Sequence, residues 1–378
     1  MANERAEYRK LRLNMRTSGR EKHASERRLT NRLRIGKHMD SSMTSKRFRI
    51  VIVGAGAISR VAHIPAVLAS PIAELVAIVD PNEAQAASVC QLYGIKPEIA
   101  GDISKVRSPY DAAIVATPND LHAPVAEALL ERGIPVLIEK PLAADLAAAD
   151  RIAVVAEKTG TLAAVGYQTR FSGACRALKS VLDTGQFGSP VRFACQHGSR
   201  GGWSPASGYN LDTKRAGGGV LVTTGTHFLD RLIWLWGEPS DVSLTDNGDN
   251  GPESHSIARF IFDGSGSPFS GTAYFSKLVA LTESFVVETE QGVLVIKGDK
   301  PDTVAFRPHA NPGFTYDITP DGAGHDPREL YQRQLEDFID ACRSGAKPQV
   351  DAELGRASVA LLSRLYASRQ SLAADHYA

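Results

Sequence analysis

Apolar runs and helical stretches alternate through the first part of the chain. Arg49 to Val53 is short and almost entirely β-branched, which is typical of a parallel strand buried on both faces. We expect strands over 49–53, 75–79, 112–116 and 136–138, with helices that begin near Ala57 and cover 84–93 and 123–132. This order predicts an α/β fold with a doubly wound parallel sheet of the Rossmann type.

The second part of the chain has a different pattern, in which polar and apolar residues alternate over short segments. We expect strands over 256–262, 270–276, 284–289 and 293–296. The D-G-S-G and Q-G turns between these segments predict a run of hairpins. Two amphipathic stretches near the end, 327–344 and 353–370, predict helices.

A glycine turn follows the first predicted strand, in V-G-A-G-A-I-S. Gly54 suits a tight turn, and Gly56 lacks the side chain that would hold a pyrophosphate away from the backbone. Ala57 and Ile58 open the next helix, whose free N–H groups favour phosphate. The third position of this fingerprint, normally glycine, is Ser59, which is also small.

An acid ends the second predicted strand at the spacing that a ribose contact requires. Asp80 lies about 20 residues after the glycine turn, where a carboxylate binds the ribose hydroxyls of a dinucleotide. Pro81 and Asn82 follow it, so no adjacent arginine favours a 2′-phosphate. The turn and the acid together predict a nicotinamide dinucleotide, and they favour NAD over NADP.

Composition is that of an ordinary globular protein, with 43% hydrophobic and 22% charged residues in 378. That length predicts two domains, which we place at 48–168 and 169–378. We find no apolar run long enough to span a bilayer and no signal peptide, so we expect a cytoplasmic protein. The four cysteines form no C-x-x-C pair, so we predict no metal site.

Residues 1–47 form a basic tail, which we expect to be disordered because it lacks apolar periodicity. Up to residue 49 the chain holds 15 Lys and Arg against 5 Asp and Glu, whereas the remainder holds 28 against 37. One interpretation is an arm that binds nucleic acid or a membrane surface. We favour the alternative of an unselected extension, with translation starting at Met39 or Met43, so we expect neither partner.

Two polar clusters follow predicted strands of the parallel sheet. They are T-P-N-D-L-H at 117–122 and E-K-P-L at 139–142. Ligands of doubly wound sheets bind at the carboxyl ends of strands, so both clusters face the expected cofactor. The residues that we expect to contact it here are Thr117, Pro118, Asn119, His122, Glu139 and Lys140.

A glycine-rich segment, 216–230, leads into another predicted helix. Thr223, His227 and Asp230 recur there at spacings of four and three, which places them on one helical face. An isolated histidine on a helix is more often structural than catalytic.

These motifs together resemble the Gfo/Idh/MocA family, which includes glucose-fructose oxidoreductase and inositol dehydrogenases. The resemblance is carried by V-G-A-G-A-I-S, T-P-N-x-x-H, G-I-P-V-L-I-E-K-P-L-A, G-G-G-x-x-x-x-x-G-x-H and the terminal Y-x-x-Q-L-E-D-F-I-D-A-C-R-S-G-A-K-P, over some 330 residues. It implies a Rossmann domain followed by an α/β domain whose open, largely antiparallel sheet forms a homodimer or homotetramer.

The resemblance also implies catalytic roles. Lys140 matches the lysine that bonds the reacting hydroxyl, and His227 matches the general base that takes its proton. Family dehydrogenases commonly have aspartate four residues before the histidine, where this chain has Thr223. We keep Thr223 as a catalytic and substrate-binding candidate. Without that negative charge we expect His227 to be a weaker base, unless Asp230 or a substrate carboxylate substitutes.

Further substrate contacts are expected from two segments that flank the predicted cleft. Tyr167 and Arg170 lie at the start of the second domain. Trp203 and Asp212 lie in a segment rich in Gly, Ser and aromatic residues, which suits a sugar. A purely structural role in the loop is an equally good interpretation for Trp203 and for Asp212.

The leading hypothesis is an NAD-dependent dehydrogenase that oxidises a secondary alcohol of a sugar, inositol or related polyol, or reduces the matching ketone. One alternative is a glycosidase or lyase that uses NAD for transient oxidation. The other is a catalytically silent dinucleotide-binding regulator, which the missing aspartate favours.

Overall fold

The computed structural model describes residues 46–200, 208–249, 251–264, 267–298, 300–320 and 327–372. The predicted tail up to residue 45 lies outside these described residues, and so does Trp203. Among the described residues, no helix is both long and apolar enough to cross a membrane.

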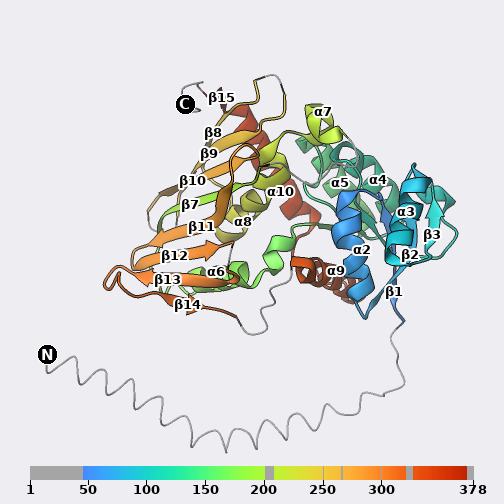
Figure 1. The fold of residues 1–378 in the computed structure, drawn as a ribbon, viewed down its shortest axis with the longest axis horizontal. Helices are drawn as coiled ribbons and strands as arrows, with labels where there is room; N and C mark the ends of the chain where they lie inside the picture. The colour runs from blue at the N-terminus through green and yellow to red at the C-terminus, as the bar shows by residue number, and fades with distance from the viewer. Residues whose placement is uncertain are drawn as a thin grey trace, which may run out of the picture. The chain divides into compact units, whose positions relative to one another are not determined.

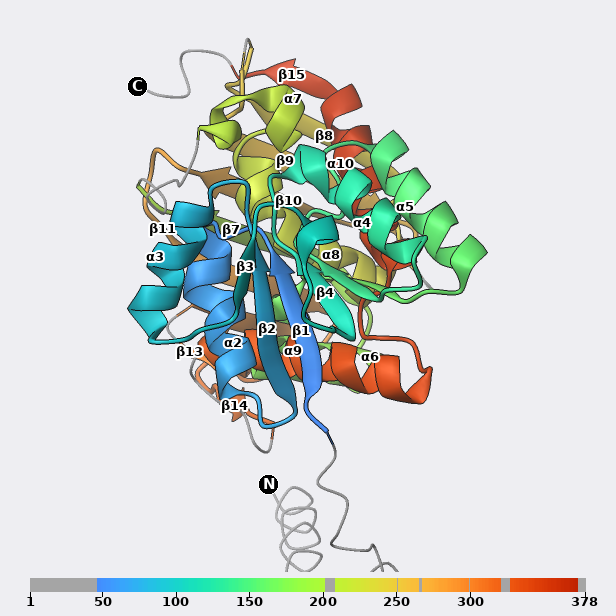
Figure 2. The same cartoon turned by 90° about the vertical axis from the view of Figure 1, so that its right-hand side faces the viewer.

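The first half of the described chain forms a six-stranded parallel sheet in the order β3-β2-β1-β4-β5-β6 (Figure 2). Its strands are β1 (Phe48–Val53), β2 (Ala73–Val79), β3 (Glu98–Ala100), β4 (Ala112–Val115), β5 (Val136–Ile138) and β6 (Ala163–Val165). The central strands are buried on both faces, as their β-branched runs predict. The strand order reverses between β1 and β4, which is where such sheets bind their ligands.

Helices cover both faces of this sheet. They are η1 (Ser59–His63), α2 (Ile64–Ala69), α3 (Glu83–Tyr93), η2 (Ile103–Lys105), η3 (Asn119–Leu121), α4 (His122–Leu130) and α5 (Leu146–Thr159). The Asn82 side chain caps the start of α3, and Gly94 ends that helix in the left-handed region at φ 64°. The helix predicted after the glycine turn consists of η1 and α2, and its first part, η1, is a π-helix.

The second half forms a nine-stranded mixed sheet in the order β14-β13-β12-β11-β7-β10-β9-β8-β15 (Figure 1). Its strands are β7 (Pro190–Gly198), β8 (Asp241–Asp246), β9 (His255–Phe262), β10 (Phe269–Ser276), β11 (Leu281–Thr289), β12 (Gly292–Lys297), β13 (Lys300–Pro308), β14 (Tyr316–Ile318) and β15 (Arg369–Ser371). Most pairs are antiparallel, but β7 pairs with β10 and β8 with β15 in parallel. The expected largely antiparallel sheet is confirmed.

The helices of this half lie on the side of the large sheet that faces the Rossmann sheet (Figure 1). They are η4 (Gln168–Phe171), α6 (Gly173–Asp183), η5 (Tyr209–Leu211), α7 (Thr213–Ala216), η6 (Leu221–Gly225), α8 (Thr226–Trp236), α9 (Pro327–Ser344) and α10 (Ala352–Ala367). Phe228, Leu229 and Leu232 of α8 pack into one apolar core with Phe260 and Phe275 of the sheet. Phe228 at the start of α8 thus packs on Phe275 near the carboxyl end of β10, and Trp236 at the end of α8 packs on Phe269 at the start of that strand.

The two C-terminal helices also pack against the Rossmann half. Phe338 and Ile339 of α9 are fully buried in the cluster that contains Ile50 and Ile52 of β1. Val359 of α10 joins the cluster on the other face of the same sheet. The boundary at 168/169 remains a prediction, but helices from beyond it complete both apolar layers of the Rossmann sheet.

Two predicted helix ends were wrong, and the first is that of α4, which was expected to reach Arg132 but ends at Leu130. The last helix was expected to reach Gln370, but α10 ends at Ala367, and Gln370 lies in β15. The change of structure has a clear cause: the Arg369 guanidinium pairs with the buried Asp246 carboxylate on β8, and Leu372 N donates to Asp246 O. A tertiary ion pair therefore overrides the helical pattern.

Candidate active site

The glycine turn after β1 has the geometry that a pyrophosphate requires. Gly54 has φ +105°, and a Cβ there would overlap the Ala116 carbonyl, so only glycine fits. A Cβ built on Gly56 would meet nothing within 4 Å. The space in front of Gly56 is therefore open for a ligand to approach the backbone.

Ser59 explains the departure from the three-glycine fingerprint. Its hydroxyl is fully buried and donates to the Gly54 carbonyl oxygen at 2.6 Å. Serine therefore contributes a hydrogen bond that ties the first turn of η1 to the glycine turn, where glycine would allow only close packing. Ala57 and Ile58 lie between them, partly buried, at the start of the helix.

Asp80 lies directly beside this turn. Its carboxylate accepts from Ala55 N and from Asn82 N, both at 2.8 Å. Gln85, which the sequence did not single out, donates to Ala55 O from the start of α3. The buried Thr117 hydroxyl, at the end of the neighbouring strand β4, has no partner among the described residues. Open space at Gly56 and this unpaired hydroxyl fit a dinucleotide.

Two residues expected to touch the cofactor are bonded within the protein, and their cofactor contacts stay predictions. Asn119 is buried, and its amide donates to Ala216 O in the second half of the chain at 2.8 Å. His122 is fully buried between Pro141 O at 2.9 Å and Thr117 O at 3.0 Å. Burial lowers the pKa of His122, so the neutral ring donates to only one of these carbonyls. Both residues position the loops around Pro118.

Glu139 is also buried, and it pairs with a histidine that the sequence analysis missed. His63 Nε2 lies 2.8 Å from its carboxylate, and Lys140 N donates to it at 3.1 Å. Burial acts to raise the pKa of Glu139, but the hydrogen bond with His63 and the positive charge of Lys140 are among the interactions that act against it, and the pKa is lowered overall. Glu139 is therefore a charged, enclosed group next to Lys140, and its pairing with His63 leaves a cofactor contact as a prediction only.

Lys140 reaches from the Rossmann half into the second half. Its ammonium group donates to Thr223 O at 2.9 Å, although the two residues are 83 positions apart. Burial lowers the pKa of Lys140, and nearby Lys277 lowers it further, whereas Glu139 acts in the opposite direction. The structure thus brings Lys140 and the backbone of Thr223 together, whereas their catalytic roles stay predictions.

His227 follows one helical turn later, but the geometry of this segment differs from the expected single helix. Thr223 lies in the π-helix η6, and its hydroxyl donates to Gly219 O at 3.1 Å. His227 Nδ1 is buried and has no partner among the described residues. Burial, followed by the charges of Lys140 and Arg231, places the pKa of His227 well below 6.5. The imidazole is therefore neutral at pH 7.

Asp230 does not replace the missing family aspartate. It is fully buried and accepts two hydrogen bonds from Arg170, at 2.7 and 2.9 Å. Arg170, predicted to bind substrate, is therefore committed to this ion pair. Tyr167 is also fully buried, and its hydroxyl shares a 2.8 Å hydrogen bond with Thr226. Tyr167 and Arg170 thus both bond to side chains of α8, and their substrate contacts stay predictions.

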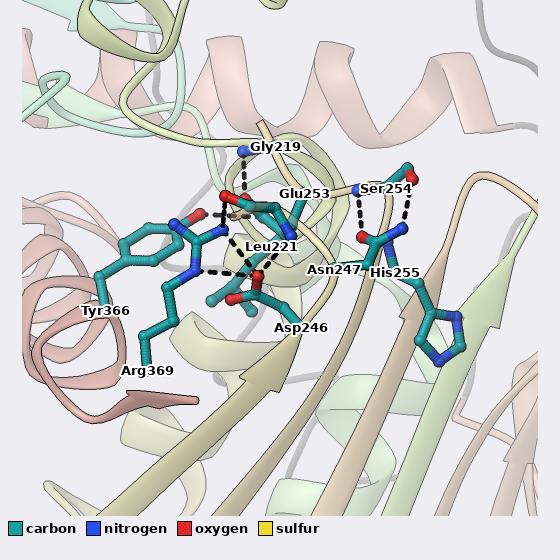
Figure 3. A network of polar contacts seen from close by, with 10 residues as sticks. Gly219, Leu221, Asp246, Asn247, Glu253, Ser254, His255, Tyr366 and Arg369 are labelled. Carbon is teal, nitrogen blue, oxygen red and sulfur yellow. Dashed lines mark hydrogen bonds and ion pairs between the residues drawn. The ribbon is translucent and has the colours of Figure 1, made fainter. Parts of the chain in front are cut away.

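The glycine-rich segment before η6 is fixed by Glu253, another residue that the sequence analysis missed (Figure 3). Its carboxylate accepts from Gly219 N, Leu221 N and the Tyr366 hydroxyl, each at 2.9 Å. A Cβ on Gly219 would overlap the Glu253 backbone. The glycines therefore allow η6 to start directly against this buried acid.

Asp212 has a local role in the structure. Its carboxylate caps α7 by accepting from Lys214 N at 2.9 Å and Arg215 N at 3.4 Å. Arg215 in turn pairs with Asp120 of η3 at 3.0 Å, which ties this segment to the Rossmann half. Asp212 is exposed, so its predicted substrate contact stays a prediction.

In the described part of the chain, no group of three or more His, Cys, Asp or Glu residues lies close enough together to hold a metal ion. Glu253 carried no sequence signal, because only tertiary folding brings its partners near, and the same holds for the approach of Lys277 to Lys140. For His63 the sequence offered one hint, its spacing of four from Ser59, which places both residues on one face of a helix.

Comparison with known families identifies the chain. The profile of the oxidoreductase family with an NAD-binding Rossmann fold matches residues 48–167, and that of its C-terminal alpha/beta domain matches 179–373. The chain belongs to the Gfo/Idh/MocA oxidoreductase family. The expected NAD-binding domain and fold class are thereby confirmed.

Several family members resemble the chain over most of its length. The rhizopine catabolism protein MocA of Rhizobium meliloti is 29% identical over 336 residues, which is 84% of this chain and 96% of that protein. The D-glucoside 3-dehydrogenase of Escherichia coli K12 is 26% identical, covering 88% and 98%. A levoglucosan dehydrogenase solved with NADH and levoglucosan has the same fold, with a TM-score of 0.75, 19% identity and coverage of 85% and 97%.

Proposed function

We propose that this family member is an NAD-dependent dehydrogenase that oxidises a secondary alcohol of a sugar, inositol or related polyol, or reduces the matching ketone. The observation that carries the proposal is the meeting of Lys140 with the segment that holds Thr223 and His227, next to a dinucleotide turn. The named activities of the relatives support it, since they include a glucoside 3-dehydrogenase and inositol 2-dehydrogenases.

The cofactor fits the turn through Gly54, Gly56 and Asp80, and it supplies the hydride acceptor when bound. Asp80 would bind the ribose hydroxyls, and its charge disfavours a 2′-phosphate, so NAD is preferred to NADP. The Thr117 hydroxyl, buried and unpaired, would donate to the cofactor edge. Pro118 and Glu139 would lie beside the bound cofactor, and the proposal requires no hydrogen bond from either of them.

Lys140 binds the reacting oxygen in this proposal. Its ammonium group donates to the substrate hydroxyl and stabilises the negative charge that develops on that oxygen. The burial of Lys140 strengthens this interaction, because a hydrogen bond from a charged donor is stronger where water is excluded. The Thr223 carbonyl holds the ammonium in place through the 2.9 Å contact.

His227 is the general base. Its neutral imidazole accepts the hydroxyl proton, while the hydrogen on the same carbon leaves with its electron pair as hydride. Tyr167 packs edge-on against the ring, with centroids 6.2 Å apart, and thus restricts its orientation. Thr223 adds no negative charge to this arrangement, so the base has a low pKa and acts without an acidic partner.

We also propose a homodimer or homotetramer in the cytoplasm, formed through the outer face of the large sheet. Ile261 of β9 and Tyr274 of β10 are exposed there, on neighbouring strands. Apolar residues on an exposed sheet face favour self-association. Sedimentation tests this proposal, since a monomer at micromolar concentration would contradict it.

Nicotinamide absorbance, followed with a panel of polyols, glycosides and keto sugars, tests the proposed reaction. Net reduction of NAD by a polyol is the expected result. Glycoside cleavage without net reduction would instead indicate transient oxidation, and NAD binding without any reaction would indicate a regulator. Either of those results contradicts the dehydrogenase.

A further inference from the structure

The acids around the candidate active site are all bonded to groups of the protein itself. Glu139 is paired with His63, and Asp230 is paired with Arg170. Glu253 accepts three hydrogen bonds, two from backbone N–H groups and one from a tyrosine. Among the described residues, the cations at this site therefore have no free carboxylate to neutralise them.

Lys277 is a second lysine at this site, and its position follows from the sheet. It comes directly after β10, and its N–H continues the strand pairing by donating to Ser254 O at 2.7 Å. Side chains alternate along a strand, so Lys277 lies on the same face as Phe275. Phe275 is fully buried, and its ring would lie 3.1 Å from a Cβ on Gly225, the last residue of η6.

Lys277 is therefore on the face of β10 that η6 covers, next to the Glu253 segment. The other lysine, Lys140, is bonded to Thr223 in the middle of the same η6. Lys277 is half-buried, and its ammonium group has no hydrogen-bond or salt-bridge partner among the described residues. Two ammonium groups thus approach η6 from opposite halves of the chain.

The electrostatics agree with this placement. Lys277 lowers the pKa of Lys140, after the larger effect of burial. Burial likewise lowers the pKa of Lys277, and only Glu253 opposes it. Both ammonium groups are destabilised by their surroundings, and an anion bound between them would relieve that cost.

We propose that Lys277 binds an anionic group of the substrate, so that the preferred substrate is an acidic sugar or polyol with a carboxylate or phosphate near the reacting hydroxyl. This inference rests on the proposed dehydrogenase function and names its substrate class. The substrate then supplies the negative charge that Thr223, in place of aspartate, does not. Lys140 remains on the reacting oxygen, and Lys277 determines specificity.

Calorimetric titration of the NAD-loaded protein tests the proposal. Glucose is compared with glucuronate and with glucose 6-phosphate, which separate a carboxylate from a phosphate on one sugar. We expect one acid to bind about tenfold more tightly than glucose, the effect of one charge-assisted contact. Lys277→Met should remove this preference, whereas Lys277→Arg should retain part of it. Lys158→Met, which removes an exposed lysine of α5, should leave the preference unchanged.

Equal binding of the acids and glucose by the unaltered protein would overturn the proposal. A preference for acids that persists in Lys277→Met would also overturn it. Affinity for NAD, measured on each variant, shows whether the variant is folded. Turnover is a separate measurement: an acid preference that depends on Lys277, in a protein that reduces no NAD, would contradict the dehydrogenase function and leave the anion site standing.

Discussion

Thr223 determines the electrostatic character of the candidate active site. A carboxylate at this position would favour imidazolium and raise the pKa of His227. The threonine hydroxyl instead donates to Gly219 O, and the pKa of His227 lies well below 6.5 because of burial and the neighbouring charges of Lys140 and Arg231. The base is weak but fully deprotonated at neutral pH.

The pH dependence of turnover follows from this low pKa. A general base acts in its neutral form, which is present above its pKa, so activity should fall only as the pH drops well below 6.5. Thr223→Asp should raise the pKa of His227 and move this acidic limb to higher pH. Profiles of kcat/KM for both proteins make the comparison, and identical acidic limbs would contradict the assigned base.

The Thr223 hydroxyl also fixes the π-helix to Gly219. Thr223→Ser keeps the donor, whereas Thr223→Val keeps the shape and removes it. We expect Val to lower kcat/KM more than Ser, by about one order of magnitude for one lost hydrogen bond. Equal activity of the two variants would show that the Thr223 hydroxyl has no role in turnover.

At the scale of elements, η6 is positioned by a loop that folds directly against a buried acid. Glu253 binds the N–H groups of Gly219 and Leu221, and Tyr366 donates to the same carboxylate (Figure 3). Asp246 and Arg369 pair beside this network and attach β15 to β8. The carbonyl that holds Lys140 therefore depends on contacts made by residues far along the chain.

Gly219→Ala tests this dependence. Its Cβ would overlap the Glu253 backbone, so we expect a loss of roughly 1–3 kcal/mol in stability and a larger relative loss of turnover. Gly251→Ala is a matched control, because a Cβ there meets nothing within 4 Å. Denaturant unfolding and steady-state kinetics measure the two effects. If both variants behaved alike, the loop would not position the site.

At the scale of the whole molecule, the two halves of the described chain share their cores. Phe338 of α9 is fully buried among residues of the Rossmann sheet, although it follows strands β7 to β14 of the second sheet in sequence. Lys140 and Asn119 add polar contacts across the same boundary. The site is built where the two halves meet, so its geometry depends on this packing.

Phe338→Ala should destabilise the Rossmann half and weaken NAD binding. Deletion of a fully buried phenylalanine costs about 3–5 kcal/mol. Val154→Ala, at a largely exposed position of α5, is the control and should change stability little. Thermal unfolding with and without NAD measures both variants. If NAD raised the unfolding temperature of Phe338→Ala as much as that of the unaltered protein, α9 would not be needed for NAD binding by the Rossmann half.

The sequence predicted those features that depend on local pattern. The strands, the glycine turn and Asp80 follow from periodicity and motif, whereas the joint role of Lys140 and His227 follows from the family resemblance and stays a prediction. His63 and Glu253 could not be predicted, because each acts through a partner that only tertiary folding brings near, and the position of Lys277 depends on the pairing of the large sheet. Nor could the sequence predict that Asp230 and Thr226 bind Arg170 and Tyr167 in the interior.

The most direct test of the central claim is the turnover of His227→Ala and Lys140→Met at constant NAD affinity. Using a polyol that the unaltered protein oxidises, we expect each variant to bind NAD normally and to lose about 10²–10⁴-fold in kcat. Retained turnover in either variant, with NAD still bound, would contradict the catalytic site described here.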